Sequence, residues 1–110
     1  MRRGDLVTVA AAGDYGKPRP AVVITNNILL SREHAGIALC QFTTSIGSAD
    51  DFRITIEPSS ENGLKLRSDI MIDKPISVSR HRIGITIGRL SDADVLRLDV
   101  ALAFALGLAE

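Results

Sequence analysis

The stretch MRRGDLVTVAAAGDYGKPRPAVVI, residues 1–24, predicts a strand, a tight polar loop and a second strand. Val7 and Val9 are branched at Cβ, which favours extended backbone over residues 6–10. Residues 20–25, PAVVIT, form an apolar run without alternation, which is typical of a strand buried on both faces. Between the two runs, Gly13 and Gly16 tolerate the positive φ angles of a tight turn. The chain is therefore predicted to open with two strands of a β-rich fold.

Arg19 stands between Pro18 and Pro20 at the mouth of the second strand. Pro20 favours an extended conformation for Arg19, and Pro18 restricts its own φ angle, so the backbone that carries the guanidinium is stiff. Both prolines lack a backbone donor, which a sheet tolerates at a strand start or at an edge. We expect this aimed cation either to bind a ligand or to pair with a nearby aspartate.

Further strands are predicted over residues 36–44, 52–57, 69–73 and 84–90. One helix follows, because Ser91, Asp92 and Asp94 have the pattern of an N-cap with acids in the first turn. Behind them apolar residues repeat at helical spacing, namely Val95, Leu98, Leu102 and Leu106, joined by Leu96, Val100 and Phe104. Such a helix is either enclosed in the core or part of a subunit interface. The expected fold is mainly β with a C-terminal helix, as a small, strongly bent sheet or barrel.

Composition narrows the class of protein. With 110 residues and 45% hydrophobic content, residues 1–110 are predicted to form a single domain. The single cysteine, Cys40, excludes an internal disulfide, is expected in the core and fits a reducing cytoplasm. Neither a signal peptide nor a membrane span is predicted. The formal charge is zero, but residues 1–90 carry 12 Lys and Arg against 9 Asp and Glu, a modest basic excess.

Polar side chains at predicted strand ends are the candidates for chemistry. Thr43 and Thr44 begin a run of three hydroxyl residues, and the spacing of Arg67 and Asp69 directs both to one face of extended backbone. A guanidinium matches phosphate oxygens, hydroxyls orient them and a carboxylate accepts a proton, so together with Arg19 this set suits a phosphodiester. Alternatively, the threonines stabilise a turn and the Arg-x-Asp pair is a surface ion pair.

The loop before the second strand adds two candidate contacts to nucleic acid. Tyr15 either stacks on a nucleobase or packs on Pro18, and Lys17 lies between Tyr15 and Arg19. Two histidines and one cysteine make no convincing metal site. Phosphate-binding Gly-rich loops and the HExxH, CxxC and Gly-x-Ser-x-Gly motifs are absent, so neither a metal nor another cofactor is predicted. A carboxylate-bound Mg²⁺ remains as the alternative.

Several segments, in chain order, resemble the MazF/PemK toxins: Arg3-Gly4-Asp5 at a strand start, residues 18–24 (PRPAVVI), Thr43-Thr44, and the terminal strand and helix. Residues 57–74 also resemble a subgroup of that family with a shortened first loop. The resemblance covers essentially the whole chain. It implies an SH3-like barrel with a C-terminal helix, shared with the CcdB gyrase poisons. It also implies a homodimeric, cytoplasmic toxin of a type II toxin–antitoxin module, blocked by a cognate antitoxin protein.

The same resemblance implies an endoribonuclease that cuts single-stranded RNA such as mRNA without metal. In the family reaction the ribose 2′-OH attacks the adjacent phosphate, leaving a 2′,3′-cyclic phosphate and a 5′-OH. Arg19 matches the family arginine at the scissile phosphate, and Thr43 and Thr44 match hydroxyls near it. Arg67 and Asp69 match an Arg-x-Asp pair that is treated as acid and base. Because a guanidinium is a poor proton donor at neutral pH, we expect Arg67 to act as an electrostatic stabiliser.

Residues 12–17, AGDYGK, depart from the family pattern because they contain neither the Glu nor the His of many members. Either Asp69 is the catalytic base, or Asp14 substitutes for it, or catalysis is weak. Two other functions remain as alternatives: a non-catalytic, CcdB-like poison of a protein such as gyrase, and a degenerate module that binds an antitoxin without activity. The phosphate-handling residues argue against the first alternative, and the loop departure keeps the second one open.

Overall fold

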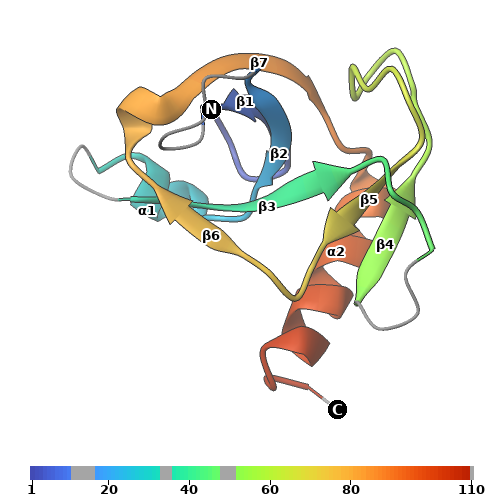
Figure 1. The fold of residues 1–110 in the computed structure, drawn as a ribbon. Coiled ribbons are helices and arrows are strands. Elements are labelled where there is room, and N and C mark those ends of the chain that lie inside the picture. Colours follow the sequence, from blue (N-terminus) through green and yellow to red (C-terminus); the bar gives the residue numbers. More distant parts are fainter. Residues whose placement is uncertain (11–16, 33–35, 48–51, 110) are drawn as a thin grey trace.

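The computed structural model describes residues 1–10, 17–32, 36–47 and 52–109 (Figure 1). Its elements, in chain order, are β1 (Asp5–Val9), β2 (Arg19–Val23), α1 (Asn27–Leu30), β3 (Ile37–Thr43), β4 (Arg53–Ile56), β5 (Ser68–Met71), β6 (Ile76–Val78), the 3₁₀ turn η1 (Arg80–Arg82), β7 (Ile83–Arg89) and α2 (Asp92–Ala105). Among these residues, no helix is long and apolar enough to cross a membrane.

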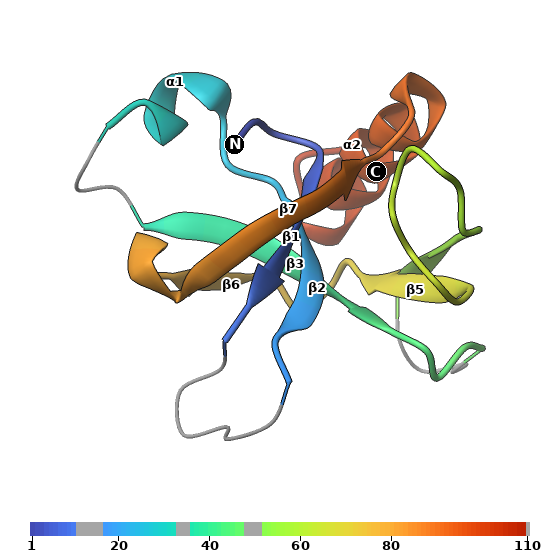
Figure 2. The same ribbon diagram turned by 90° about the horizontal axis from the view of Figure 1, so that it is seen from above.

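The strands form one antiparallel sheet in the order β4-β5-β3-β2-β1-β7. β3 is the central strand, because β2 lies on one of its edges while β6 and β5 share the other edge. η1 joins β6 to β7, and Figure 1 shows β7 curving back over β3 and β6. Seen from above, α2 lies beside the sheet, well apart from α1 (Figure 2). This bent sheet with a C-terminal helix confirms the predicted fold class.

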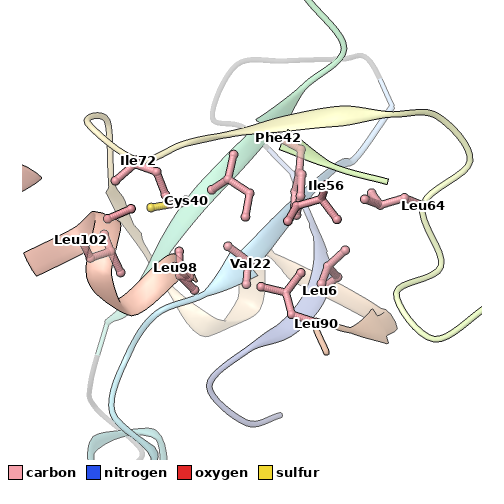
Figure 3. Close-up of a cluster of buried hydrophobic side chains, with 12 residues drawn as sticks. Leu6, Val22, Cys40, Phe42, Ile56, Leu64, Ile72, Leu90, Leu98 and Leu102 are labelled. Carbon is pink, nitrogen blue, oxygen red and sulfur yellow. The ribbon is translucent and has the colours of Figure 1, made fainter. Parts of the chain in front are cut away.

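Both faces of β1 and β2 are buried. Leu6 lies opposite Val22, and both belong to a core cluster that also includes α2 residues (Figure 3). Val7 lies opposite Ala21, and both belong to a second buried cluster. Residues of β3 and β6 also contribute to this cluster. The prediction of a strand buried on both faces is therefore confirmed for residues 21–23.

The segment Arg3-Gly4-Asp5 ties the start of β1 to the C-terminal part of the chain. Gly4 has a φ angle of +92°, which a side chain at Cβ disfavours. Asp5 pairs with Arg89 of β7 at 3.0 Å, and Arg3 pairs with Asp99 of α2 at 2.5 Å. These contacts hold β1 in place beside β2, whose first residue is Arg19.

Ser91 caps α2, because its Oγ atom accepts a hydrogen bond of 3.1 Å from the Asp94 amide. One side of the helix packs against the sheet through Leu98 and Leu102 (Figure 3). The other side exposes large apolar residues, namely Leu96, Val100 and Phe104. Within one chain the helix is therefore not enclosed in the core, which leaves the subunit interface as the surviving prediction.

Other differences from the sequence prediction concern short elements. The four-residue α1 and the three-residue β6 are too short to produce a readable hydrophobic period and were not predicted. The strand predicted over residues 69–73 begins at Ser68 and ends at Met71. Leu106, predicted as the last member of the helical repeat, lies just beyond the helix end and is 57% exposed.

Candidate active site

A row of polar side chains crosses the sheet near the ends of its strands. Asp69 of β5 lies opposite Thr43 of β3 on one side and opposite Thr55 of β4 on the other. The register of β2 with β3, continued by two residues, places Arg19 opposite Thr43. Directly opposite residues of antiparallel strands lie on the same face of a sheet. These four side chains therefore share one face, although they come from four separate segments.

A cleft of about 330 Å³ lies at the Arg19 end of this row. The side chains on its walls include Arg19, Gln41, Thr43, Thr44, Ser68 and Met71. Arg19 is exposed, and no carboxylate in the described part of the chain pairs with it. The expected alternative, an ion pair with a nearby aspartate, is therefore not formed among these residues. The guanidinium faces solvent, where it can bind an anion in bidentate fashion.

The hydroxyl groups of the cleft have defined partners. Thr43 Oγ1 accepts a hydrogen bond of 3.1 Å from the Ser45 amide, so this threonine stabilises a turn and also lines the cleft. Ser68 Oγ donates a hydrogen bond of 2.9 Å to the Leu66 carbonyl. Both hydroxyls keep hydrogen-bonding capacity for a ligand. With Thr44, three hydroxyls lie around one cation.

Asp69 is buried next to this cleft, with only 3% of its surface exposed. Its Oδ1 atom accepts a hydrogen bond of 2.6 Å from Thr55 Oγ1, and its Oδ2 atom accepts a longer one of 3.4 Å from the Gly47 amide. The carboxylate therefore connects β5 to β4 and to the segment that follows β3. Burial of this acid was not expected from the sequence.

Arg67 lies just before β5 and does not line the cleft. Its Nε atom is 2.9 Å from Glu57 Oε1, and both side chains are mostly exposed. The two residues continue the register in which Thr55 lies opposite Asp69. Arg67 and Asp69 thus lie on one face, as their spacing implies, but each has a partner on β4 or just beyond its end. An exposed ion pair of this kind is weak and can exchange for another anion.

The residues of the cleft wall that sequence reasoning missed include Gln41, Ser68 and Met71. Gln41 precedes Thr43 by two positions on β3, so the period of a strand was sufficient to place it on the same face. Met71 lies opposite Gln41 when the β3–β5 register is continued by one residue. This juxtaposition depends on the pairing of distant strands and has no local sequence pattern.

The remaining predicted contacts come from the loop before β2. Lys17 is exposed, two residues before Arg19. Tyr15 and the alternative base Asp14 lie outside the described residues. In residues 1–10, 17–32, 36–47 and 52–109, no group of three or more His, Cys, Asp or Glu side chains is placed to hold a metal ion.

Cys40 lies on the core side of β3 and is fully buried, which confirms its prediction as a core residue. Burial raises the pKa of the Cys40 thiol from its ordinary value of 9.0 to about 11, while Arg3 slightly opposes this rise. The thiol is therefore protonated at neutral pH and is a packing group of the core cluster (Figure 3).

Comparisons with known proteins identify the family of this chain. Residues 2–106 match the model of a family described as PemK-like, MazF-like toxin of type II toxin–antitoxin system. A relative from Mycolicibacterium smegmatis, named probable endoribonuclease MazF, is 43% identical over 110 residues, which cover 99% of each chain.

Solved structures share the fold at lower identity. An endoribonuclease in complex with its cognate antitoxin, from a mycobacterial species, superposes with a TM-score of 0.77 at 23% identity, covering 100% of this chain and 96% of that one. The Mycobacterium tuberculosis toxin MazF-mt6 superposes with a TM-score of 0.78 at 19% identity, covering 96% of this chain and 99% of that one. The resemblance seen in the sequence is thereby confirmed, and the chain belongs to the PemK-like, MazF-like toxins of type II toxin–antitoxin systems.

Proposed function

We propose that the protein is a metal-independent endoribonuclease that cuts single-stranded RNA, including mRNA, at short sequences. The observation that carries this proposal is the cleft in which Arg19 lies beside the hydroxyls of Thr43, Thr44 and Ser68. Arg19 binds the scissile phosphate through two of its N–H groups, and the hydroxyls orient the phosphate oxygens. The name of the M. smegmatis relative, probable endoribonuclease MazF, supports the same activity.

The proposed reaction needs only groups of the RNA and of the protein. The 2′-OH of one ribose loses its proton and attacks the adjacent phosphorus, and the bond to the 5′-oxygen of the next nucleotide breaks. That oxygen takes up a proton, so the products are a 2′,3′-cyclic phosphate and a 5′-OH. Arg19 stabilises the charge that develops on the phosphate oxygens. Arg67 leaves its ion pair with Glu57, contacts the RNA phosphate instead, and adds positive potential there.

Asp69 is proposed as the acceptor of the 2′-OH proton, with Asp14 as the alternative. Among the described residues, Oδ2 of Asp69 accepts only the 3.4 Å hydrogen bond from the Gly47 amide, so it is the less strongly bonded oxygen. Because Asp69 is 3% exposed, RNA has to displace residues 45–47 to reach it. The two assignments are separated by the pH dependence of kcat, since substitution of the true base by asparagine removes the acidic limb of the profile.

Residues 1–110 are proposed to form a single domain that assembles as a cytoplasmic homodimer. Support comes from a groove of about 650 Å³ between β4 and α2, lined mainly by Phe52, Ile54, Leu96, Val100 and Phe104, and called the apolar groove below. Arg97, the one charged residue in the described part of its lining, donates hydrogen bonds to Asp94 and to the Thr55 carbonyl. A second copy of the chain would cover these side chains with its own apolar groove, as in an isologous interface.

A cognate antitoxin is the proposed protein partner. The solved mycobacterial endoribonuclease that shares this fold was captured with such a partner. The cation of the cleft suits an acidic segment of an antitoxin, which would occupy the phosphate site and block RNA. Competition between RNA and the antitoxin for the parent protein, measured by fluorescence anisotropy, tests this arrangement.

The function is tested by incubating the purified protein with long single-stranded RNA in excess EDTA. We expect discrete cuts whose products carry a 2′,3′-cyclic phosphate, and loss of these cuts in Arg19→Ala. Arg32→Ala is the matched control, because Arg32 is exposed on the segment after α1. Intact RNA with the parent protein, or cutting by Arg19→Ala at the parental rate, overturns the proposal. Growth arrest with intact RNA and damaged DNA would point instead to a poison of a DNA enzyme.

A further inference from the structure

A second hollow, of about 360 Å³, adjoins the Arg19 cleft and has no role in the reaction described above. It shares Pro20, Thr44 and Ser68 with the cleft, so the two spaces meet along a common rim at the ends of β2, β3 and β5. Its other walls include Thr8, Pro18, Leu64, Lys65, Leu66 and Ile87. We call this space the side hollow.

The strand geometry places the cleft and the side hollow on opposite sides of that rim. Successive side chains of a strand point to opposite faces. Arg19 and Thr43 therefore face the cleft, whereas their neighbours Pro20 and Thr44 are shared with the side hollow. A ligand that crosses the rim would put one of its groups beside the guanidinium and the next group in the side hollow.

The far wall of the side hollow is a rigid turn. Asn62 is buried, and its Oδ1 atom accepts hydrogen bonds from the amides of Ser59 at 3.0 Å and Leu64 at 2.9 Å. Its Nδ2 atom donates to the Glu57 carbonyl at 2.9 Å. Gly63 has a φ angle of +72°, and a Cβ atom there would lie 2.1 Å from the Ile87 carbonyl oxygen. The turn is thus locked against β7, and the residues that follow it have a preset position.

Leu64, just after Gly63, belongs to the core, but Leu66 is not needed to complete it. Leu66 is 64% exposed and belongs to neither core cluster. Together with Ile87 and the ring of Pro18 it presents apolar surface beside the cation of the cleft. An apolar space next to a phosphate-binding group matches a nucleotide, in which a flat base is joined to a phosphate through the sugar.

We propose that the side hollow binds the nucleobase of the nucleotide adjoining the scissile phosphate. This inference rests on the proposed RNA cleavage and adds to it a site that determines which base lies next to the cut. Leu66 covers one face of the base, and Lys65 supplies a charge close to the backbone. These are specificity residues and take no part in the proton transfers.

The polar groups of the side hollow favour a base edge rich in acceptors. Thr8 Oγ1 already accepts a hydrogen bond of 3.0 Å from the Ile85 amide, so the hydroxyl is left to donate its proton. The Lys65 ammonium can only donate. Carbonyl oxygens, as on uracil and guanine, satisfy both donors, whereas the amino groups of adenine and cytosine do not. The expected preference at this position is therefore for uracil or guanine.

The test maps every cut in a long RNA for the parent and for Leu66→Ala and Lys65→Gln, all in excess EDTA. An oligonucleotide that carries the preferred site then gives kcat and KM separately. We expect KM to rise about tenfold in each variant with kcat changed less than about threefold, and the preference for one base beside the cut to weaken. Ile28→Ala on α1, where Ile28 is 71% exposed, is the matched control and should leave both constants unchanged.

Unchanged KM and unchanged base preference in both variants, with a parent that cuts, overturn the side-hollow assignment alone. A preference for adenine or cytosine that survives Lys65→Gln overturns the acceptor-edge assignment. A parent that cuts no RNA overturns the proposed function instead. In that case the affinity for a 2′-O-methyl RNA oligonucleotide decides the side hollow: weakening by Leu66→Ala supports it, and equal affinity or no binding by the parent rejects it.

Discussion

The Arg19 cleft and the apolar groove differ in the chemistry of their side chains, which are mainly polar in the cleft and mainly apolar in the groove. The cleft combines a cation, three hydroxyls and an amide side chain at the ends of three strands. The groove presents aromatic and aliphatic side chains from α2, from β4 and from Phe52 just before β4. The ring centroids of Phe52 and Phe104 are 5.3 Å apart. Both regions lie around the same core cluster, to which β3 and α2 contribute (Figure 3).

The difference shows how one small core supports two separate tasks. Polar groups at strand ends can be brought together without burying charge, because strand ends lie at the surface. A helix with apolar residues on two sides buries one side in its own chain and leaves the other for a second surface. Substitutions in one region should therefore spare the task of the other.

The largest effect is expected for Arg19→Ala, which removes the cation of the cleft. Cleavage should fall by about 10²- to 10³-fold, because one preorganised donor to a developing anion is lost. Association of two chains and thermal stability should stay at the parental level, since Arg19 is exposed. Single-turnover cleavage and sedimentation velocity measure the two effects. A parallel loss of association would show that the cleft and the groove are not independent.

Phe104→Asp is the converse substitution in the apolar groove. Phe104 is 57% exposed in the single chain, so folding should persist while association weakens. Loss of an interface aromatic typically costs about 2–4 kcal/mol, which corresponds to a roughly 30- to 1,000-fold weaker dimer. Ile85→Asp is the control, because Ile85 is 68% exposed on β7 and outside the groove. Dimers of unchanged stability in Phe104→Asp would remove the proposed interface.

Gly63→Ala and Gly107→Ala together compare the steric cost of a Cβ atom at two glycines with positive φ angles. Gly63 has a positive φ angle and would place its Cβ atom against the Ile87 carbonyl, whereas Gly107, after α2, has a φ angle of +75° with open space around it. We expect Gly63→Ala to destabilise the fold by about 2–3 kcal/mol and Gly107→Ala by about 1 kcal/mol. Urea unfolding gives both values. Equal losses would mean that the turn beside the side hollow is not locked against β7.

The smallest effect concerns Cys40, in the core that the two regions share. Its pKa is raised by burial from 9.0 to about 11, so the unfolded chain loses this proton at a lower pH than the folded chain. The free energy of unfolding should therefore be steady below pH 8 and fall by about 1 kcal/mol between pH 8 and pH 10 through this group alone. Cys40→Ala should lack this part of the decline. An identical slope in the parent and the variant would indicate that solvent reaches the thiol.

Local chemistry was sufficient to predict most elements of the fold. The β-branched residues of β1, the apolar run of β2 and the Ser91 cap of α2 act over a few residues, so they are readable without a structure. The same holds for Arg19, whose flanking prolines restrict the backbone wherever the strand is placed. Short elements such as β6 were not predicted, because three residues are too few to show a hydrophobic period.

Only the tertiary structure determines which polar side chains lie close together. The sequence contains Thr43, Thr55 and Asp69, but their alignment follows from the register of β3, β4 and β5. Register depends on hydrogen bonds between strands that are distant in the chain, and a shift by one residue would turn every side chain to the other face. The burial of Asp69 and the side hollow behind Leu66 arise in the same way, from the packing of a turn against β7. Residue types and strand positions are thus properties of the sequence, whereas the cleft and its neighbour exist only once the sheet has closed.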